Sequence, residues 1–261
     1  EGRYLDALKL IKDFNPFPAV CGAICNRRCE QQCTRGLIDQ PLAIDEIKKF
    51  IAEQELHEDK RYIPLCENVE GNFFTNKMAI IGAGPAGMSA AYYLRIMGYP
   101  VTIFEKEEKP GGMLVYGIPS FRLEKSVIEA EIEVLKAMGI EFKCGIEVGK
   151  DISLDDLRSK GYEAFYVAIG AQGSRKLNIP GEENEMVESG IDFLRKVNKT
   201  ENPNLISGDV VVVGGGNVAI DVARAALRSG AKKVHLYSLE QETEMPASPE
   251  EVLEAKEEGI I

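Results

Sequence analysis

Several hallmarks of other protein classes are missing from this sequence. The 261 residues contain no apolar run of about 18 residues, so neither a transmembrane helix nor membrane insertion is expected. The chain begins without Met and without a basic-then-apolar signal pattern, which predicts a portion cut from a longer cytoplasmic protein. The formal net charge of −11 disfavours a nucleic-acid partner, because phosphate backbones require a basic surface.

Side-chain catalysis also has little support. His57 and His235 are isolated, and no Ser-His-Asp or paired-carboxylate pattern surrounds either of them. Cys66 and Cys144 have no partner in a Cys-x-x-Cys pair, which disfavours dithiol chemistry. We therefore expect no catalytic acid, base or nucleophile, and any chemistry would come from bound cofactors.

The remaining cysteines are grouped. Each is separated from the next by three residues, and they are Cys21, Cys25, Cys29 and Cys33. So dense a group in a sequence of cytosolic type favours metal over disulfides. Soft thiolates suit either an iron–sulfur cluster or zinc, and the spacing does not separate the two.

The rest of the chain predicts an α/β fold with two Rossmann-like dinucleotide-binding domains, preceded by a small helical segment. Residues 1–62 are expected to be helical, and residues 63–76 form a charged, aperiodic linker. Strand–turn–helix–strand patterns begin at residues 77 and 209, and the two domains are assigned to 77–205 and 206–261. Both domains are expected to be incomplete at the C-terminus.

The first strand ends in a glycine-rich turn of the form GxGxxG, at Gly82, Gly84 and Gly87. These glycines permit a tight turn, approach of the backbone to a pyrophosphate and close helix–strand packing. Pro85 and Ala86 open the helix, whose N-terminus favours negative charge. Because Glu105 ends the next strand, where a carboxylate can accept hydrogen bonds from ribose hydroxyls, we predict a dinucleotide site.

The second turn is a GxGxxA variant. Its residues are Gly214, Gly216, Asn217, Val218 and Ala219. Glu240 closes the following strand, in the position equivalent to Glu105. FAD together with a nicotinamide nucleotide best explains two such sites in one chain.

The segments around these turns resemble the family of glutamate synthase small subunits and the flavin-bearing part of dihydropyrimidine dehydrogenase. The resemblance lies in Gly82–Gly87, Glu105, Gly111–Leu114, Tyr116–Pro119, Phe121–Leu123, Ala168–Ala171, Ile179–Glu182, Gly214–Asp221, Arg224 and Met245–Ala247. It implies FAD at the first turn, with further contacts from Lys106, Gly112, Met113, Arg122 and Gly170. It also implies a nicotinamide nucleotide at the second turn, hydride transfer between the two cofactors, and electron flow to a larger catalytic or electron-accepting subunit.

The same resemblance implies that the cysteine group holds [4Fe–4S] ligands. In that family two clusters draw on this group and on an upstream group, which this sequence does not contain. A polar residue on the following helix completes one cluster in some relatives, and the corresponding position here falls on Lys48, a poor ligand. The family also returns to its flavin domain after the nicotinamide domain, so we expect this portion to hold FAD incompletely and to be inactive alone.

The sequence departs from the NADPH-using relatives at the end of the second domain's last strand. Those relatives carry Tyr-Arg-Arg, whose arginines bind the 2′-phosphate, whereas here Tyr237 is followed by Ser238 and Leu239. Because Glu240 would repel a 2′-phosphate and accept a hydrogen bond from a free 2′-hydroxyl, we predict that NAD(H) is favoured over NADP(H).

Two alternatives stay open at this point. The chain could belong to a genuine NADPH-dependent glutamate synthase small subunit, with electrons used by a large partner. It could also be a non-catalytic nucleotide-binding scaffold whose cysteines hold zinc. A flavin spectrum separates the scaffold from both redox readings, and the identity of the partner separates the two redox readings from each other.

Overall fold

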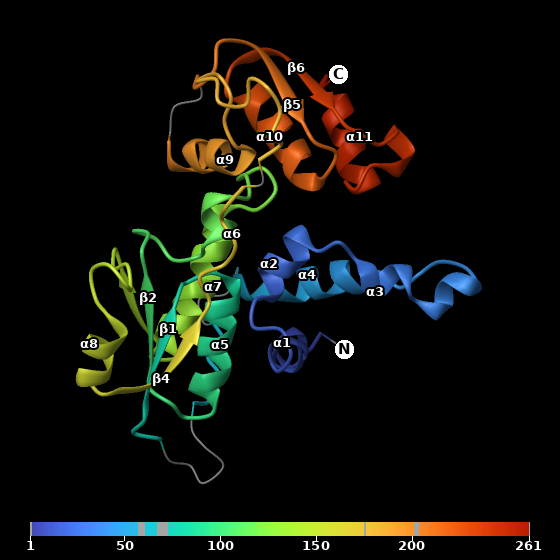
Figure 1. The fold of residues 1–261 in the computed structure, drawn as a ribbon. Coiled ribbons are helices and arrows are strands. Elements are labelled where there is room, and N and C mark those ends of the chain that lie inside the picture. Colours follow the sequence, from blue (N-terminus) through green and yellow to red (C-terminus); the bar gives the residue numbers. More distant parts are fainter. Residues whose placement is uncertain (1, 57–60, 67–72, 175, 201–203, 261) are drawn as a thin grey trace. The chain divides into compact units, whose positions relative to one another are not determined.

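The computed structural model divides the chain into two compact units (Figure 1). It describes residues 2–56, 61–66, 73–174, 176–200 and 204–260. Unit 1 comprises Glu1–Val115 and Phe121–Gly170, and unit 2 comprises Tyr116–Ser120 and Ala171–Ile261. The sequence places the boundary between the two dinucleotide domains at residue 205, whereas residues 171–205 lie in unit 2. The assignment of each domain to a cofactor stays a prediction.

Unit 1 begins with the expected helical segment. Its elements are α1 (Tyr4–Lys12), α2 (Pro18–Ile24), α3 (Arg28–Gln31), the 3-10 helix η1 (Thr34–Leu37) and α4 (Ile44–Leu56). Leu8, Ala19 and Ala52 form its core, against which Val127 of a later helix packs. Of the expected linker, residues 63–66 and 73–76 have no helix or strand, and the remainder lies outside the described residues.

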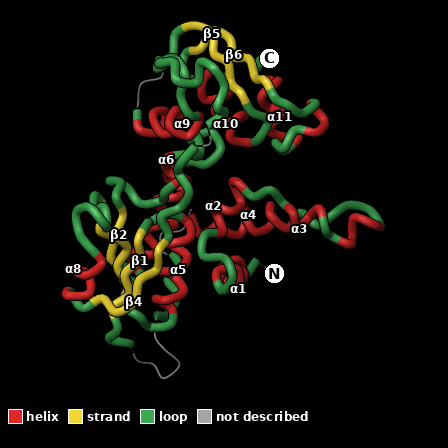
Figure 2. The backbone as a smooth tube through the Cα atoms, in the orientation of Figure 1, coloured by secondary structure: helices red, strands yellow, loops and turns green. Residues whose placement is uncertain are grey.

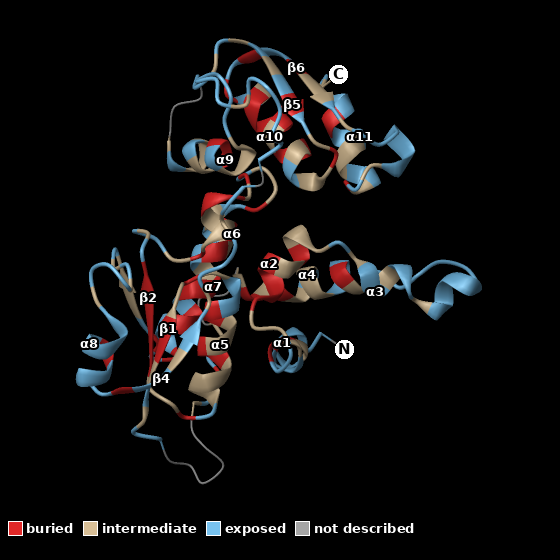
Figure 3. Cartoon of the chain, in the orientation of Figure 1, coloured by how far each residue is buried: buried red, intermediate tan, exposed pale blue. Residues whose placement is uncertain are grey.

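A parallel sheet follows, as the strand–helix–strand pattern predicts (Figure 2). Its strands are β1 (Lys77–Ile81), β2 (Val101–Glu105), β3 (Glu141–Cys144) and β4 (Tyr162–Val167). The order across the sheet is β3-β2-β1-β4, so β1 pairs with strands on both sides. Residues 101–105 of β2 are all buried, as parallel strands covered on both faces must be (Figure 3).

Helices cover both faces of this sheet. Helices α5 (Pro85–Ile96) and α7 (Lys125–Ala137) lie on one face and α8 (Leu154–Ser159) on the other (Figure 1). Because successive side chains of a strand point to opposite faces of the sheet, each strand packs against the helices on both faces. Leu157 of α8 packs with Ala79 and Phe104, while Ile80 points to α5. The short helix α6 (Met113–Tyr116) follows β2.

Unit 2 contains a two-stranded parallel sheet of β5 (Gly208–Val213) and β6 (Ala231–Tyr237). Its helices are α9 (Gly190–Lys199), α10 (Asn217–Arg228), the 3-10 helix η2 (Glu242–Glu244) and α11 (Pro249–Glu257). Helix α10 packs on both strands and on both neighbouring helices, and Ile220 joins Ala247 and Ala255 in an apolar cluster. None of the described helices has the length and apolar character that a membrane span requires.

Candidate functional site

The first glycine turn joins β1 to α5, and each glycine meets a different spatial demand. Gly82 has φ +106°, and a Cβ there would stand 2.4 Å from the carbonyl oxygen of Ala168. A Cβ on Gly87 would stand 2.0 Å from the carbonyl oxygen of Gly82. Gly84 has no atom within 4 Å of its Cβ position, so the backbone there is open to a ligand. The turn thus has the three properties that a bound pyrophosphate requires.

Glu105 lies at the end of β2 beside this turn. Its Oε2 accepts a hydrogen bond from the amide of Ala83 at 2.7 Å, and its Oε1 accepts one from the amide of Glu107 at 2.9 Å. The side chain is buried, so these two backbone donors fix the carboxylate. Because a carboxylate oxygen has two lone pairs, each oxygen keeps acceptor capacity for a ribose hydroxyl.

A second glycine loop lies against the first turn. The amide of Gly111 donates to the carbonyl oxygen of Ala83 at 2.8 Å, and a Cβ on Gly112 would stand 2.8 Å from the Cα of Gly84. Gly112 has φ +54°, so both its conformation and its surroundings favour glycine. The structure thereby brings Gly112 and the following Met113 to the turn that the sequence assigns to FAD.

The other residues expected at the flavin site are distributed around this centre. Pro85 and Ala86 are exposed at the start of α5, Lys106 is exposed after β2, and Arg122 is half-buried. Gly170 is exposed with φ +71° and lies shortly after the Ala168 carbonyl that contacts Gly82. The open glycine and the fixed carboxylate fit the pyrophosphate and ribose of a dinucleotide, while the roles of individual residues stay predictions.

The second glycine turn joins β5 to α10. Gly214 has φ +144°, and a Cβ there would stand 3.3 Å from the Cβ of Ala219. The absence of a Cβ at Gly214 leaves room for alanine where the first turn has its third glycine. Gly216 has no atom within 4 Å of its Cβ position, and Val218 is exposed. The open backbone again fits a phosphate group at the start of a helix.

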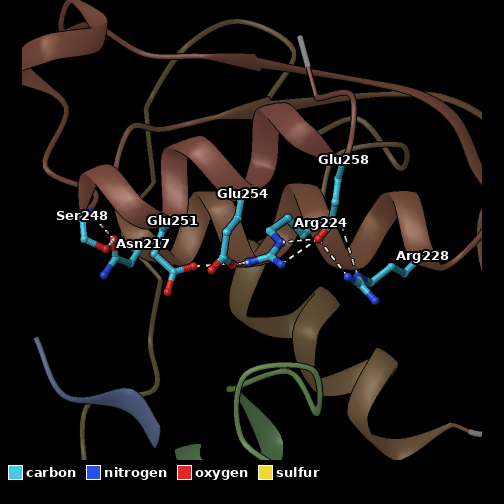
Figure 4. A network of polar contacts seen from close by, with 7 residues as sticks. All are labelled: Asn217, Arg224, Arg228, Ser248, Glu251, Glu254 and Glu258. Carbon is cyan, nitrogen blue, oxygen red and sulfur yellow. Dashed lines mark hydrogen bonds and ion pairs between the residues drawn. The ribbon is translucent and has the colours of Figure 1, made fainter. Parts of the chain in front are cut away.

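A loop that sequence reasoning identified only as a family match is attached to this second turn. The amide of Ala247 donates to the carbonyl oxygen of Gly215 at 3.0 Å. The Oδ1 of Asn217 accepts from the amide of Ser248 at 2.8 Å (Figure 4). The Asn217 side chain, expected to contact a nucleotide, therefore uses one of its polar atoms to hold residues 245–248.

Ser238 and Glu240 lie close to Gly215. The prediction that Glu240 closes the strand in the position equivalent to Glu105 is wrong, because β6 ends at Tyr237. Tyr237 accepts from the amide of Gly214 as Phe104 does from that of Gly82, so Ser238 occupies the equivalent position and Glu240 follows two residues later.

The hydroxyl of Ser238 donates to Oε2 of Glu240 at 2.5 Å and accepts from the amide of Glu240 at 3.1 Å. These hydrogen bonds hold the pKa of the Glu240 carboxyl below its ordinary value. The sequence singles out Glu240, but Ser238 only as a replacement for an arginine. The Ser-x-Glu spacing is the signal that could have revealed the pair.

The cysteine group is distributed over α2, α3 and the loops around them. Cys29 is exposed, the other three are half-buried, and all are free thiols. Burial raises the pKa of Cys21, whereas the amide of Leu42 is the main cause of the lowered pKa of Cys33. Among the described residues, no three Cys, His, Asp or Glu side chains converge as metal ligands would. The thiol chemistry suits iron, but this arrangement does not form a ligand set.

The segment around the cysteines contains a buried charge. Asp45, at the start of α4, is buried, and Oδ1 lies 3.3 Å from Nζ of Lys48. Neither carboxylate oxygen of Asp45 has a hydrogen-bond partner in the described part of the chain. Lys48, which falls at the position of a possible cluster ligand, is thus paired with Asp45.

Two protein families match this chain. Residues 76–259 match the pyridine nucleotide-disulphide oxidoreductase family, and residues 1–60 match dihydropyrimidine dehydrogenase domain II, 4Fe-4S cluster. The resemblance stated from the sequence motifs is thereby confirmed.

Similar proteins include subunits of larger enzymes. The NADP(+)-dependent formate dehydrogenase subunit beta of Moorella thermoacetica is 41% identical over 100% of this chain and 40% of its own length. The NAD-dependent dihydropyrimidine dehydrogenase subunit PreT of Escherichia coli K12 is 37% identical over 97% of this chain and 60% of its own length. This chain therefore spans 40% to 60% of these two relatives.

A solved structure is also similar. Mycobacterium tuberculosis FprA, in complex with NADPH, is 25% identical and superposes with a TM-score of 0.60 over 70% of this chain and 48% of its own.

Proposed function

Because the chain belongs to the pyridine nucleotide-disulphide oxidoreductase family, we propose that it is part of a cytoplasmic electron-transfer flavoprotein subunit. In this proposal, NADH passes a hydride to FAD, and electrons continue to [4Fe–4S] clusters and a larger catalytic or electron-accepting subunit. The reverse flow uses the same groups. One observation carries the proposal: two open glycine turns, each at a helix N-terminus, are each accompanied by a glutamate near the end of the next strand, which is the last residue of β2 in the first case and lies three residues beyond β6 in the second.

FAD when bound supplies the ability to accept a hydride and release electrons one at a time. The chain's own residues bind and orient. Gly84 and the first residues of α5 would hold a pyrophosphate, and Glu105 would accept hydrogen bonds from ribose hydroxyls. The buried position of Glu105 and its two backbone donors keep that acceptor fixed before any ligand arrives.

The family match of residues 1–60 supports onward electron transfer to iron–sulfur clusters. The geometry of the thiols adds no support, because no ligand group forms among the described residues. A cytoplasmic location accords with six free thiols, because a reducing compartment preserves them. A larger partner accords with the names of the relatives, which describe subunits.

The preference for NADH is carried by Glu240. An ionised carboxylate there would repel a 2′-phosphate and accept a hydrogen bond from a 2′-hydroxyl. Arginine, the usual partner of a 2′-phosphate, is absent from residues 237–240, and Lys232 and Lys233 are at the beginning of β6. The relatives' names include both NAD and NADP, so the family leaves this choice to the residues of each chain.

An anaerobic titration of the full-length protein tests the proposal. We expect a flavin absorbance spectrum that NADH bleaches at far lower concentration than NADPH. Preferential bleaching by NADPH would contradict the role of Glu240 and favour the alternative that the chain belongs to an NADPH-dependent glutamate synthase small subunit. A protein without a flavin spectrum after reconstitution with FAD would contradict the redox function itself.

A further inference from the structure

Ser238 makes two hydrogen bonds to one residue, and only one of them is needed to shape the backbone. Its hydroxyl accepts from the amide of Glu240 at 3.1 Å, which is a local turn interaction common for serine. The same hydroxyl donates to Oε2 of Glu240 at 2.5 Å. This second bond fixes an exposed carboxylate that would otherwise exchange among rotamers in water.

Gly215 provides the surface on which this pair lies. It is buried, and a Cβ at that position would stand 2.5 Å from Oγ of Ser238 and 2.9 Å from Oε2 of Glu240. The middle glycine of the second turn thus contacts the two side chains directly. The hydroxyl of Ser238 and the carboxylate of Glu240 thus occupy the space that a side chain at position 215 would fill.

We infer that Ser238 is a positioning residue for nicotinamide nucleotide specificity, which holds Glu240 where it favours a free 2′-hydroxyl and opposes a 2′-phosphate. This inference rests on the proposed role of Glu240. The lowered pKa of Glu240 accords with it, because the hydroxyl of Ser238 is the main cause of that shift and stabilises the ionised carboxylate in this position. Ionisation is what makes the group both an acceptor and a repulsive charge.

The test compares dissociation constants for NADH and NADPH in the full-length protein at neutral pH. Ser238→Ala removes the donor, and we expect NADH to bind about three- to tenfold more weakly, the factor of one lost hydrogen bond. NADPH affinity should stay within about twofold of its wild-type value. Glu240 keeps its negative charge in this variant and only becomes less ordered, so its repulsion of a 2′-phosphate does not increase. Ser238→Thr keeps the hydroxyl and should restore the NADH preference.

Glu240→Gln and the double variant separate the possible outcomes. We expect Ser238→Ala to add nothing in the Glu240→Gln background, since Ser238 acts through the carboxylate. A further loss of NADH affinity in that background would show direct contact with the nucleotide and overturn the positioning role. Equal weakening of both nucleotides by Ser238→Ala would reduce Ser238 to a turn residue and also overturn it.

The same variants distinguish failure of the proposed function from failure of the role of Ser238 alone. If Glu240→Gln leaves the ratio of the two constants unchanged, the NADH assignment of Glu240 fails and the role of Ser238 fails with it. If Glu240→Gln changes the ratio but Ser238→Ala does not, only the role of Ser238 fails. Thermal unfolding of each variant verifies that the fold is retained.

Discussion

At the scale of single residues, the most unusual group is a buried charge triad in unit 1. Lys12 of α1 is fully buried, and its Nζ lies 2.7 Å from Oε2 of Glu55 and 3.9 Å from Oε2 of Glu131. Glu55 comes from α4 and Glu131 from α7, so the triad attaches the helical segment to the sheet domain. Burial raises the pKa of Glu131 to about 7 despite the nearby ammonium.

This shift predicts a pH dependence of folding. A carboxyl whose pKa is higher in the folded than in the unfolded state contributes stability below about pH 4.5, and this contribution is lost as pH rises through about 7. We therefore expect the unfolding free energy of the protein to fall, relative to Glu131→Gln, by on the order of 3 kcal/mol between these values. Urea unfolding followed by circular dichroism measures it, since the chain has no Trp.

Glu129→Gln is the matched control, because Glu129 is an exposed residue of the same helix. It should leave the pH dependence of the wild-type protein unchanged. The same pH slope in Glu131→Gln as in the wild type would contradict the assignment of the titration to Glu131.

The first glycine turn predicts opposite effects for two alanine substitutions. In Gly87→Ala the new Cβ meets the carbonyl oxygen of Gly82 at 2.0 Å, so we expect a loss of about 1–3 kcal/mol in unfolding free energy. Gly84→Ala places its Cβ in open space at φ −75°, so stability should be kept while flavin content falls. Thermal unfolding and the flavin content of the purified full-length variants measure both effects. Equal stability of the two variants would contradict the assigned roles.

At the scale of elements, α10 and α11 are joined by a charged network near their C-terminal ends (Figure 4). Arg224 of α10 is buried and donates to Glu254 at 2.6 Å and to Glu258 at 2.9 and 2.6 Å. Arg228 is exposed and also donates to Glu258. At the other end of the pair, Asn217 holds Ser248, so α11 is attached to α10 at both ends.

Loss of the buried arginine should loosen α11. We expect Arg224→Met to lower the unfolding free energy by about 1–3 kcal/mol and to increase protease cleavage within residues 238–248. The cost stays below that of a fully buried pair because Glu254 is half-exposed and can turn to water. Arg228→Met, which removes an exposed partner, should cost less than about 1 kcal/mol. Equal effects of the two substitutions would contradict the dominant role of Arg224.

Sequence reasoning found those elements whose signal is local. The apolar runs and glycine turns gave β1, β2, β5 and β6 with errors of a few residues. Strand β4 runs from Tyr162 to Val167 and ends just before Ala168, whose carbonyl oxygen lies close to Gly82. Helix α8 was missed although its Ser153–Asp156 capping box is a recognised start signal.

Contacts between distant residues were beyond such reasoning. The pairing of Lys12 with Glu131 joins residues of α1 and α7, and no pattern in either helix indicates that both charges are buried. The candidate sites behave in the same way. The glycines and Glu105 are recognisable because their spacing is imposed by the turn, whereas the bond from Ser248 to Asn217 depends on how α11 packs.

At the scale of the whole molecule, the order of strands bears on the order in which the protein is made. Strand β1 is central and pairs with β4, whose paired residues follow it by 85 or 86 positions along the chain. The backbone that lies against Gly82 comes from Ala168, immediately after β4. During synthesis the N-terminal helices and β1–β2 emerge first, but they leave one edge of β1 unpaired. The first dinucleotide site can therefore be completed only after β4 has been synthesised.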